Sequence, residues 1–367
     1  MCKNNKKILI LGGYGGLNIG DELILSSLLS DLKKHFHAKN ITVFSFDADN
    51  TKKNHNINSV YTGKKILGAL ITFKQLLFKD VLIIGGGGLI YDYGKSPNTI
   101  INYLIRALIA IILNKKLVFY AIGVGPIELR LSKILIPFVM NYASLITTRD
   151  HESNILLRSL GVKKTTIITT ADPVFALEIK TKTHSHSASF NTNTWQKISS
   201  QKGPKIAFCL LPFFKTAHGN SEKDLEIQRI IASVGDHLIS KYNANIVFLP
   251  FERQTDLEES IAVSILMGND KNVIVLKEDY SHSDVQEIIS QMDLIIGMRL
   301  HSLILAALHK VPSVAIVYHP KVQSFLRLTD QEETGIDLFE LQALKLIEKV
   351  EYVLRNSAEI QKKIQTK

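Results

Sequence analysis

Residues 12–22, GGYGGLNIGDE, follow the apolar run KILIL at residues 7–11 and contain five glycines in eleven residues. Such a run, followed by glycines and then by further apolar residues, is typical of a buried strand that turns into a helix. Asp21 and Glu22 fall in the first turn of the expected helix, where carboxylates interact favourably with the helix dipole. The stretch therefore predicts a strand–loop–helix unit, and its glycines allow a ligand to approach the backbone closely.

The glycine spacing in this loop argues against two familiar phosphate-binding loops. A dinucleotide fingerprint GxGxxG counted from Gly13 requires a glycine where Asn18 stands, and no acidic residue follows at the usual distance. The loop also lacks the GK[ST] sequence of a P-loop. A tight turn, with Asp21 only capping the helix, remains the simple alternative to a ligand site.

Beyond this loop, apolar strand-like runs alternate with stretches of helical period. The runs are KILILGG, ITVFSF, VLIIGGGG, LVFYAIGVG, SLITTRD and TTIITTADP in the first half, and KIAFCLLPF, NIVFLPF, VIVLKE, DLIIGMR and PSVAIVY in the second. This rhythm predicts βαβ units and mainly parallel sheets covered on both faces. We expect an α/β protein with two Rossmann-like domains that face a central cleft, with ligands at the carboxyl ends of the strands.

Changes in composition suggest where these domains begin and end. Residues 1–180 form the expected first domain and residues 204–336 the second. Residues 181–203 between them are rich in Ser, Thr, Asn and His and have little periodicity, as in an interdomain linker. Residues 337–367 are charged and helical in pattern, and we expect them to pack back on one of the domains.

The bulk composition narrows the range of partners. A net charge of +10 and a pI near 9.3 suit an anionic substrate or an anionic lipid surface. Nucleic-acid binding would rest on charge alone, because the basic residues are not interleaved with aromatic ones, and we do not expect it. The only cysteines, Cys2 and Cys209, support neither a disulfide framework nor a zinc site and favour a reducing compartment. The oligomeric state is not indicated by the sequence.

The N-terminal residues favour a cytoplasmic location, because the run KILIL is explained by a strand and is not followed by a cleavage site. The apolar stretch 99–113, TIINYLIRALIAIIL, is too short to span a bilayer and contains Asn102 and Arg106. We expect a buried helix there. A peripheral contact with the inner face of the cytoplasmic membrane is the sharper hypothesis for this basic protein, checked by salt-sensitive binding to anionic vesicles.

Glycines recur at two further strand ends, residues 85–88 and 123–126. Three glycine-rich strand ends in one domain predict a cleft floor made of backbone that accommodates a bulky ligand. Acidic residues at the rim of this floor can accept hydrogen bonds from hydroxyl groups, and a sugar is a natural ligand. The candidate binding residues are Gly15, Gly16, Asp21, Gly86, Gly87 and Asp92.

Two arginines stand at the ends of apolar strands, Arg149 in SLITTRD and Arg299 in DLIIGMR. A guanidinium at this position matches a carboxylate or a phosphate bidentately. An ion pair, with Asp150 in the case of Arg149, is the alternative. Leu300 and His301 follow Arg299 at the start of the expected helix, whose N-terminus favours an anion. His301 is therefore a candidate cap residue or a candidate proton donor.

Other histidines and one lysine contribute less to the expected site. Lys321 in YHPKV adds positive charge, with His319 beside it. His184, His186 and His218 have neither metal-ligand spacing nor an acidic partner, so we expect no metal.

Taken together, these segments resemble the polysaccharide pyruvyl transferases. The shared motifs occur in order along most of the chain: GYGGLNIGDE, DVLIIGGGGLIYD, YAIGVGP, TTRD followed by LLRSLGV, TADPV, FLP and DLIIGMRLHSLILAALHKVPSVAIVYHPKV. The last of these motifs is the most specific.

The resemblance implies a glycosyltransferase-B-like architecture and transfer of a pyruvyl group from phosphoenolpyruvate, without a further cofactor. The acceptor would be two sugar hydroxyls, commonly the 4 and 6 positions, of a cell-surface polysaccharide or its lipid-linked precursor, and the product a cyclic ketal. By the family pattern, Arg149 and Arg299 would hold the donor and His301 would act as acid or phosphate partner. Asp21 and Asp92 would orient the hydroxyls of the acceptor.

The sequence also departs from that family pattern. Leu211 and Phe213 stand where many members have an arginine and a tryptophan, and His319 replaces the usual acid. Gly88 and Tyr91 stand where serine and glutamine are common.

The main alternative is a nucleotide-sugar-dependent glycosyltransferase of the same architecture. Such an enzyme pairs an acidic residue late in the second domain with the ribose hydroxyls. Asp330, Glu332 and Glu333 are the candidates for this role. A third hypothesis is that the protein is a binding module without catalytic activity. This hypothesis does not explain why Arg149, Arg299 and His301 occur together.

Overall fold

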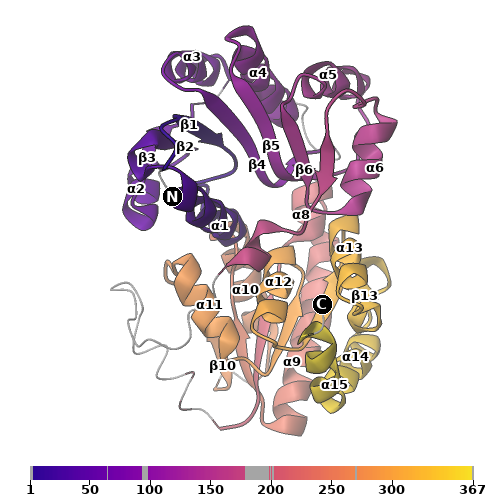
Figure 1. Ribbon diagram of the computed structural model, residues 1–367. Helices are drawn as coiled ribbons and strands as arrows, with labels where there is room; N and C mark the ends of the chain where they lie inside the picture. Colours follow the sequence, from indigo (N-terminus) through magenta and orange to yellow (C-terminus); the bar gives the residue numbers. More distant parts are fainter. Residues whose placement is uncertain are drawn as a thin grey trace. The chain divides into compact units, whose positions relative to one another are not determined.

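The computed structural model describes residues 3–63, 65–92, 98–177, 198, 200, 202–268 and 271–365. The chain divides into two compact units, Met1–Leu177 and Glu178–Lys367, each built around its own sheet (Figure 1). Most of the expected linker, residues 181–203, lies outside the described residues.

The first unit contains a seven-stranded parallel sheet with the order β3-β2-β1-β4-β5-β6-β7. Its strands are β1 (Ile8–Leu11), β2 (Ile41–Ser45), β3 (Asn58–Tyr61), β4 (Val81–Ile90), β5 (Lys116–Val124), β6 (Leu145–Thr148) and β7 (Ile167–Thr169). Its helices are α1 (Ile19–His35), α2 (Ala48–His55), α3 (Lys65–Leu76), α4 (Asn98–Ile112), α5 (Arg130–Met140) and α6 (His151–Ser159), with 3-10 turns η1 (Ala38–Asn40) and η2 (Pro173–Ala176).

Apolar side chains on both faces of this sheet hold the unit together. One core cluster joins α4, α5 and α6 to β4 and β5, and a second joins α1 to the other face of β1, β2 and β4. Every residue of β1 is buried, as expected of a central parallel strand. The chain leaves β1 toward β2 and later returns to its other side as β4, so the order reverses between β1 and β4. Open α/β sheets bind ligands at such a point.

The second unit contains a six-stranded parallel sheet with the order β10-β9-β8-β11-β12-β13. Its strands are β8 (Lys205–Cys209), β9 (Asn245–Phe248), β10 (Val273–Val275), β11 (Leu294–Gly297), β12 (Ser313–Val317) and β13 (Gly335–Asp337). Its helices are α8 (Phe213–His218), α9 (Ser221–Tyr242), α10 (Thr255–Leu266), α11 (His282–Ser290), α12 (Leu300–Leu308), α13 (Pro320–Leu328), α14 (Ala343–Arg355) and α15 (Ser357–Gln365), with 3-10 turns η3 (Glu332–Thr334) and η4 (Leu338–Glu340).

The C-terminal helices belong to this second unit. Leu346, Val350 and Val353 of α14 and Ile360 of α15 are buried in the same core cluster as β8, β9 and α9. The order of this sheet reverses between β8 and β11, which places the segments after these two strands at a second switch point.

The structure confirms the predicted α/β class. It adds two strands that the periodicity did not indicate, β3 and β13. β3 is at most half-buried, and β13 has only three residues, so neither shows a continuous apolar run. The strand β4 also continues through residues 85–88, where the sequence suggested that the strand ends, with positive φ angles at Gly85, Gly86 and Gly87.

Candidate functional site

The loop after β1 is fixed by its own side chains. Gly15 has φ +72°, and its N–H donates to Glu22 Oε1 at 2.7 Å. The other oxygen of Glu22 lies 2.7 Å from His55 Nε2 of α2. The buried Tyr14 hydroxyl donates to the carbonyl of Gly85 at 2.5 Å. These bonds tie the loop to α1, α2 and β4, so part of its glycine content serves the fold and not a ligand.

Asp21 lies at the first turn of α1, between that loop and the glycines of β4. A Cβ atom on Gly13 would lie 2.7 Å from Asp21 Oδ2, and one on Gly87 would lie 3.3 Å from Oδ1. Burial and, next, the charge of Asp21 raise the pKa of the Tyr14 hydroxyl well above its ordinary value. Asp21 is only half-buried, so a carboxylate stands at the switch point of the first sheet.

Gly16 and Gly86 are placed differently from each other. Gly16 is exposed in the loop after β1. Gly86 has φ +81°, and a Cβ atom there would lie 2.2 Å from Ile24 Cγ2 of α1. Gly86 therefore allows α1 to pack closely on β4.

Arg149 follows β6 and is only 7% exposed. Its Nη1 donates to Asp172 Oδ2 at 3.1 Å, while its Nε lies 3.8 Å from Asp150 Oδ2. The guanidinium extends over β5 toward β4, since a Cβ atom on Gly123 would lie 2.8 Å from its Nε and one on Gly88 3.6 Å from its Nη2. The ion-pair alternative is thus realised, mainly through Asp172. The sequence pattern did not single out Asp172, although it stands in TADPV directly after β7.

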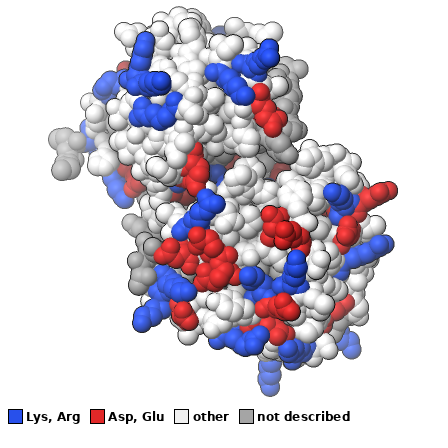
Figure 2. All heavy atoms as spheres, turned by 90° about the vertical axis from the view of Figure 1, so that its right-hand side faces the viewer, with Lys and Arg blue, Asp and Glu red and all other residues white. Residues whose placement is uncertain are grey.

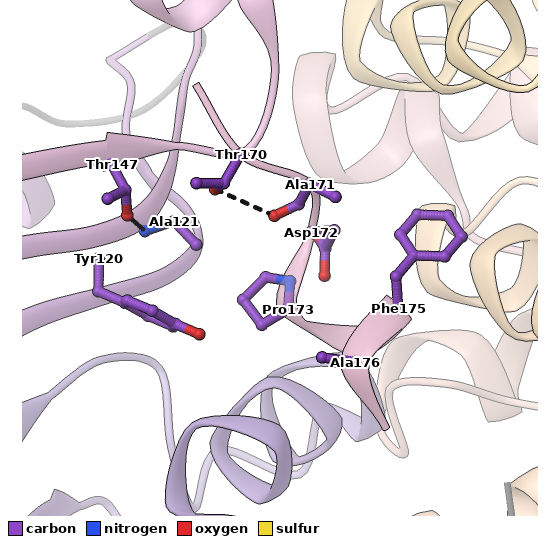
Figure 3. A pocket seen from close by; sticks show the side chains of 9 residues that line it. All are labelled: Tyr120, Ala121, Thr147, Thr170, Ala171, Asp172, Pro173, Phe175 and Ala176. Carbon is purple, nitrogen blue, oxygen red and sulfur yellow. Dashed lines mark hydrogen bonds between the residues drawn. The ribbon is translucent and has the colours of Figure 1, made fainter. Parts of the chain in front are cut away.

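A pocket of about 360 Å³ lies beside this arginine. Asp172 contacts the arginine and also lines the pocket. Its Oδ2 accepts a hydrogen bond from Arg149 Nη1, and its Oδ1 accepts one from the Val174 N–H. Figure 3 shows Tyr120 and Phe175 on either side of Pro173. The lining residues are Tyr120, Ala121, Thr147, Thr170, Ala171, Asp172, Pro173, Phe175 and Ala176.

Asp92 occupies a different position from the exposed rim that we expected. It is 3% exposed, and its carboxylate accepts from the backbone N–H groups of Glu128 at 2.7 Å and Leu129 at 3.2 Å. The reason is local: the end of β4 lies against the segment after β5, where the Asp92 N–H also donates to the Pro126 carbonyl. Asp92 therefore fixes the approach to α5.

In the second unit, Arg299 stands just after β11 as the N-cap residue of α12. Its Nε and Nη2 donate to the two carboxylate oxygens of Asp256 at 2.9 and 2.5 Å, and Nη2 also donates to Glu252 Oε2 at 2.8 Å. Asp256 is fully buried and accepts two further backbone N–H bonds. Burial lowers the pKa of Arg299, but the charge of Asp256 outweighs it and raises that pKa above its ordinary value. The guanidinium is held charged and rigid.

Leu300 and His301 form the first turn of α12. Leu300 is 7% exposed, so its side chain belongs to the interior and only its backbone is suited to contact a ligand. Arg299 takes the N-cap position, and His301 is a half-buried residue inside the helix. The cap alternative for His301 is therefore wrong.

The segment after β12 is occupied by local contacts. His319 caps α13 through Nδ1, which accepts from the Lys321 N–H at 3.2 Å. The ammonium of Lys321 lies 5.3 Å from the centre of the Tyr318 ring, which in turn packs on Phe213 at 5.2 Å. Leu211 and Phe213 are buried in the apolar core of the second unit.

Two groups of side chains result. The carboxyl edge of the first sheet brings together Asp21, Gly87, Arg149 and Asp172, and the second sheet brings together Arg299, Asp256 and Glu252 at the start of α12. Within the ranges that the structure describes, no cluster of three or more His, Cys, Asp or Glu side chains is suited to a metal ion.

Glu259, one turn after Asp256 on α10, provides a stability prediction. It is 5% exposed and accepts from Gln228 Nε2 at 2.7 Å. Burial raises its pKa from 4.5 to about 7, and the nearby charges of Asp224 and Asp256 add to the rise. The native state therefore binds this proton more tightly than the unfolded state, so its contribution is complete below about pH 4.5 and is lost as the pH rises to about 7.

Replacing Glu259 by glutamine removes this titration and keeps an acceptor for Gln228. We expect the free energy of unfolding of Glu259→Gln to exceed that of the wild type by about 2–3 kcal/mol at about pH 8 and to match it near pH 4.5. Urea unfolding at both pH values measures the difference. Equal stabilisation at the two pH values would show that the carboxyl does not titrate in this window.

Two α/β units of Rossmann type define a glycosyltransferase-B-like protein. The fold is similar to S. aureus MnaA in complex with UDP (TM-score 0.65, 12% identity, 98% of this chain and 90% of that chain). It is also similar to the Methanocaldococcus jannaschii UDP-GlcNAc 2-epimerase (TM-score 0.62, 18% identity, 95% and 92%) and to Anabaena Alr3699/HepE with UDP (TM-score 0.59, 15% identity, 98% and 94%). At these identities the similarity shows the fold alone.

The family is shown by sequence. The model of the polysaccharide pyruvyl transferase family matches residues 18–320, and the chain belongs to this family. The match includes Asp21, Arg149, Arg299 and His301. The amylovoran biosynthesis protein AmsJ of Erwinia amylovora is 22% identical over 303 residues, which cover 80% of this chain and 69% of that protein.

Proposed function

We propose that the protein transfers a pyruvyl group from phosphoenolpyruvate to two hydroxyls of a sugar, as a cyclic ketal, on a cell-surface polysaccharide or its precursor. Membership of the family supports pyruvyl transfer, and similarity to a protein of amylovoran biosynthesis supports a polysaccharide acceptor. The observation that carries the donor assignment is the charged guanidinium of Arg299, held by Asp256 and Glu252 at the start of α12.

This site suits a donor that carries both a carboxylate and a phosphate. Asp256 and Glu252 engage Nε and Nη2 of Arg299, so in our proposal Nη1 faces the donor. The first backbone N–H groups of a helix have no partner within the helix and favour an anion. Nη1 of Arg299 and the first backbone N–H groups of α12 would together give the donor a rigid contact through two groups. Arg149, held by Asp172, would provide a second cation for an anionic group of the substrates.

The proposed reaction needs a proton donor and an oriented acceptor. One sugar hydroxyl adds to C2 of phosphoenolpyruvate and loses its proton, while C3 receives a proton, which we assign to His301. The C2–O bond to phosphate then breaks, and the second hydroxyl closes the ring at C2 and loses its proton. The products are the ketal and inorganic phosphate. Asp21, half-buried at the switch point of the first sheet, would accept a hydrogen bond from the acceptor hydroxyls.

Phosphate release from phosphoenolpyruvate, measured with a panel of hexose and N-acetylhexosamine glycosides, tests this proposal. His301 and His309 stand at opposite ends of α12, and His309→Gln is therefore the matched control for His301→Gln. We expect acceptor-dependent release that His301→Gln lowers on the order of 10²- to 10⁴-fold and that His309→Gln leaves near the wild-type rate. Unchanged release by His301→Gln would remove the proton-donor role.

The second candidate function is glycosyl transfer from a nucleotide sugar. It is favoured by the similarity of the fold to MnaA and Alr3699/HepE, whose structures contain UDP. Glu333 is one of the three acids that this candidate function would pair with a ribose. It forms a salt bridge with Lys363 at 3.1 Å. Thermal stabilisation by a UDP-sugar, together with none by phosphoenolpyruvate, would favour this candidate.

A further inference from the structure

The helices α3, α4 and α5 carry an unusually apolar surface. They lie next to one another in the first unit (Figure 1). Of the twenty-five exposed large hydrophobic side chains among the described residues, thirteen lie on these helices or directly beside them. They are Ile66, Leu67, Leu70, Phe73, Leu77, Phe78, Ile105, Ile112, Leu129, Leu131, Ile134, Phe138 and Tyr142. Exposed large hydrophobic side chains that gather on neighbouring elements are typical of interaction sites.

The helix α3 buries only part of its apolar surface. Its buried side contains Gly68, Thr72 and Leu76, and Ile71 packs partly against the core of the unit. Ile66, Leu70 and Phe73, spaced three and four residues apart, are 79%, 57% and 44% exposed. Burial in the core of this unit accounts for Leu76 and Ile71 but not for these three exposed apolar side chains.

A buried arginine explains how α3 is held in this orientation. Arg106 of α4 is 1% exposed and donates to Thr62 Oγ1 at 2.7 Å and to the Gly63 carbonyl at 2.9 Å. A Cβ atom on Gly68 would lie 2.2 Å from its Nη2. The start of the inner side of α3 thus packs through small and polar groups, and Ile66, Leu70 and Phe73 are left exposed.

The charge around this surface is mainly positive. Segments 66–80, 100–116 and 128–142 contain seven lysine and arginine residues and two acidic ones, Asp80 and Glu128. Apart from the buried Arg106, these cations are exposed or half-exposed. Figure 2 shows the side of the molecule on which α5 lies, where the first unit is mostly uncharged, with several blue groups and little red.

We propose that the surface formed by α3, α4 and α5 binds an anionic phospholipid bilayer, with the three helices lying in the interfacial region. Exposed apolar side chains bordered by cations are the pattern of interfacial helices. None of the helices in the described part of the chain is long and apolar enough to cross a membrane. A second copy of the chain fits less well, because a symmetric contact would bring two cationic borders together.

This surface differs from the one suggested by the apolar stretch 99–113. Most of α4 is covered by α3, α5 and the sheet, and only Ile105 and Ile112 are prominently exposed. The lipid-binding side chains are therefore mainly those of α3 and α5. The proposal does not depend on the reaction that the protein catalyses.

Flotation with phosphatidylcholine vesicles, with and without phosphatidylglycerol, tests the proposal. We expect binding at low salt only to the anionic vesicles and release by high salt. Leu70→Glu and Ile134→Glu should each lower the partition coefficient about tenfold or more, because each removes an apolar contact and adds a repelled charge. Ile265→Glu and Leu344→Glu, at sites 76% and 75% exposed in the second unit, are the matched controls and should bind as the wild type does.

Three results would overturn the proposal: no binding to anionic vesicles at low salt, equal losses in the control variants, or self-association in sedimentation that Ile134→Glu abolishes while vesicle binding is unchanged. The last result would assign the surface to a second copy of the chain. Activity on a water-soluble acceptor should be unchanged in Leu70→Glu and Ile134→Glu, so a failure of lipid binding is distinguishable from a failure of the proposed reaction.

Discussion

Replacing Arg299 by alanine is expected to lower the free energy of unfolding by about 3–5 kcal/mol and to abolish measurable pyruvyl transfer. Asp256 has no exposed surface, and the charge of Arg299 compensates its carboxylate. Without the guanidinium, the Asp256 carboxylate is a buried charge that keeps only neutral donors, two backbone N–H groups and the Thr255 hydroxyl. Urea unfolding measures the loss of stability, and phosphate release from phosphoenolpyruvate measures the loss of activity.

A second substitution separates these two effects. Asp256→Asn in the Arg299→Ala background removes the buried charge, so we expect it to restore most of the stability and none of the activity. Arg299→Lys keeps the charge but loses the bidentate geometry, and we expect activity to fall on the order of 10²-fold. If the double variant recovered activity together with stability, Arg299 would act only on the fold and the donor assignment would be wrong.

Gly15→Ala is expected to have the second-largest effect, a loss of about 3–5 kcal/mol in the free energy of unfolding. Gly15 has φ +72°, which costs a residue with a Cβ atom about 1–2 kcal/mol. The new Cβ atom would also lie 2.0 Å from Ser45 Oγ and 2.7 Å from the backbone nitrogen of Asp47. The backbone of Asp47 cannot move away without disturbing the start of α2.

Gly219→Ala is the matched control for this substitution. Gly219 also has a positive φ, +66°, but a Cβ atom there would have no neighbour within 4 Å. Only the backbone cost applies, and we expect a loss of about 1–2 kcal/mol. Urea unfolding of both variants isolates the contribution of the close contact. Equal losses would show that the loop after β1 adjusts to a side chain.

The sequence predicted the elements whose apolar runs are continuous. Strands such as β1 and β4 are buried on both sides, so their residues show the pattern directly. β3 was missed because an edge strand that is half-exposed need not be apolar. The positions of Arg149 and Arg299 followed from the same pattern, since residues after parallel strands reach the carboxyl edge of the sheet.

The roles of several site residues depended on contacts that no local pattern contains. Asp92 was expected to contact a ligand, yet the segment after β5 supplies the N–H groups that occupy its carboxylate. Gly86 was expected to face a ligand, yet it accommodates Ile24. These partners are distant in the chain and meet only when β4 lies between β1 and β5.

The sequence by itself determined the α/β class, the family and the strand-end positions of the two arginines, because periodicity and motif order are properties of the chain. The tertiary structure decided which carboxylates hold those arginines: Asp172 lies 23 residues from Arg149, and Asp256 lies 43 residues from Arg299. It also decided that Ile66, Leu70 and Phe73 of α3 remain exposed. For the arginines the physical reason is that a buried charge must find a compensating partner, and only the packing of distant strands and helices determines which group is near enough.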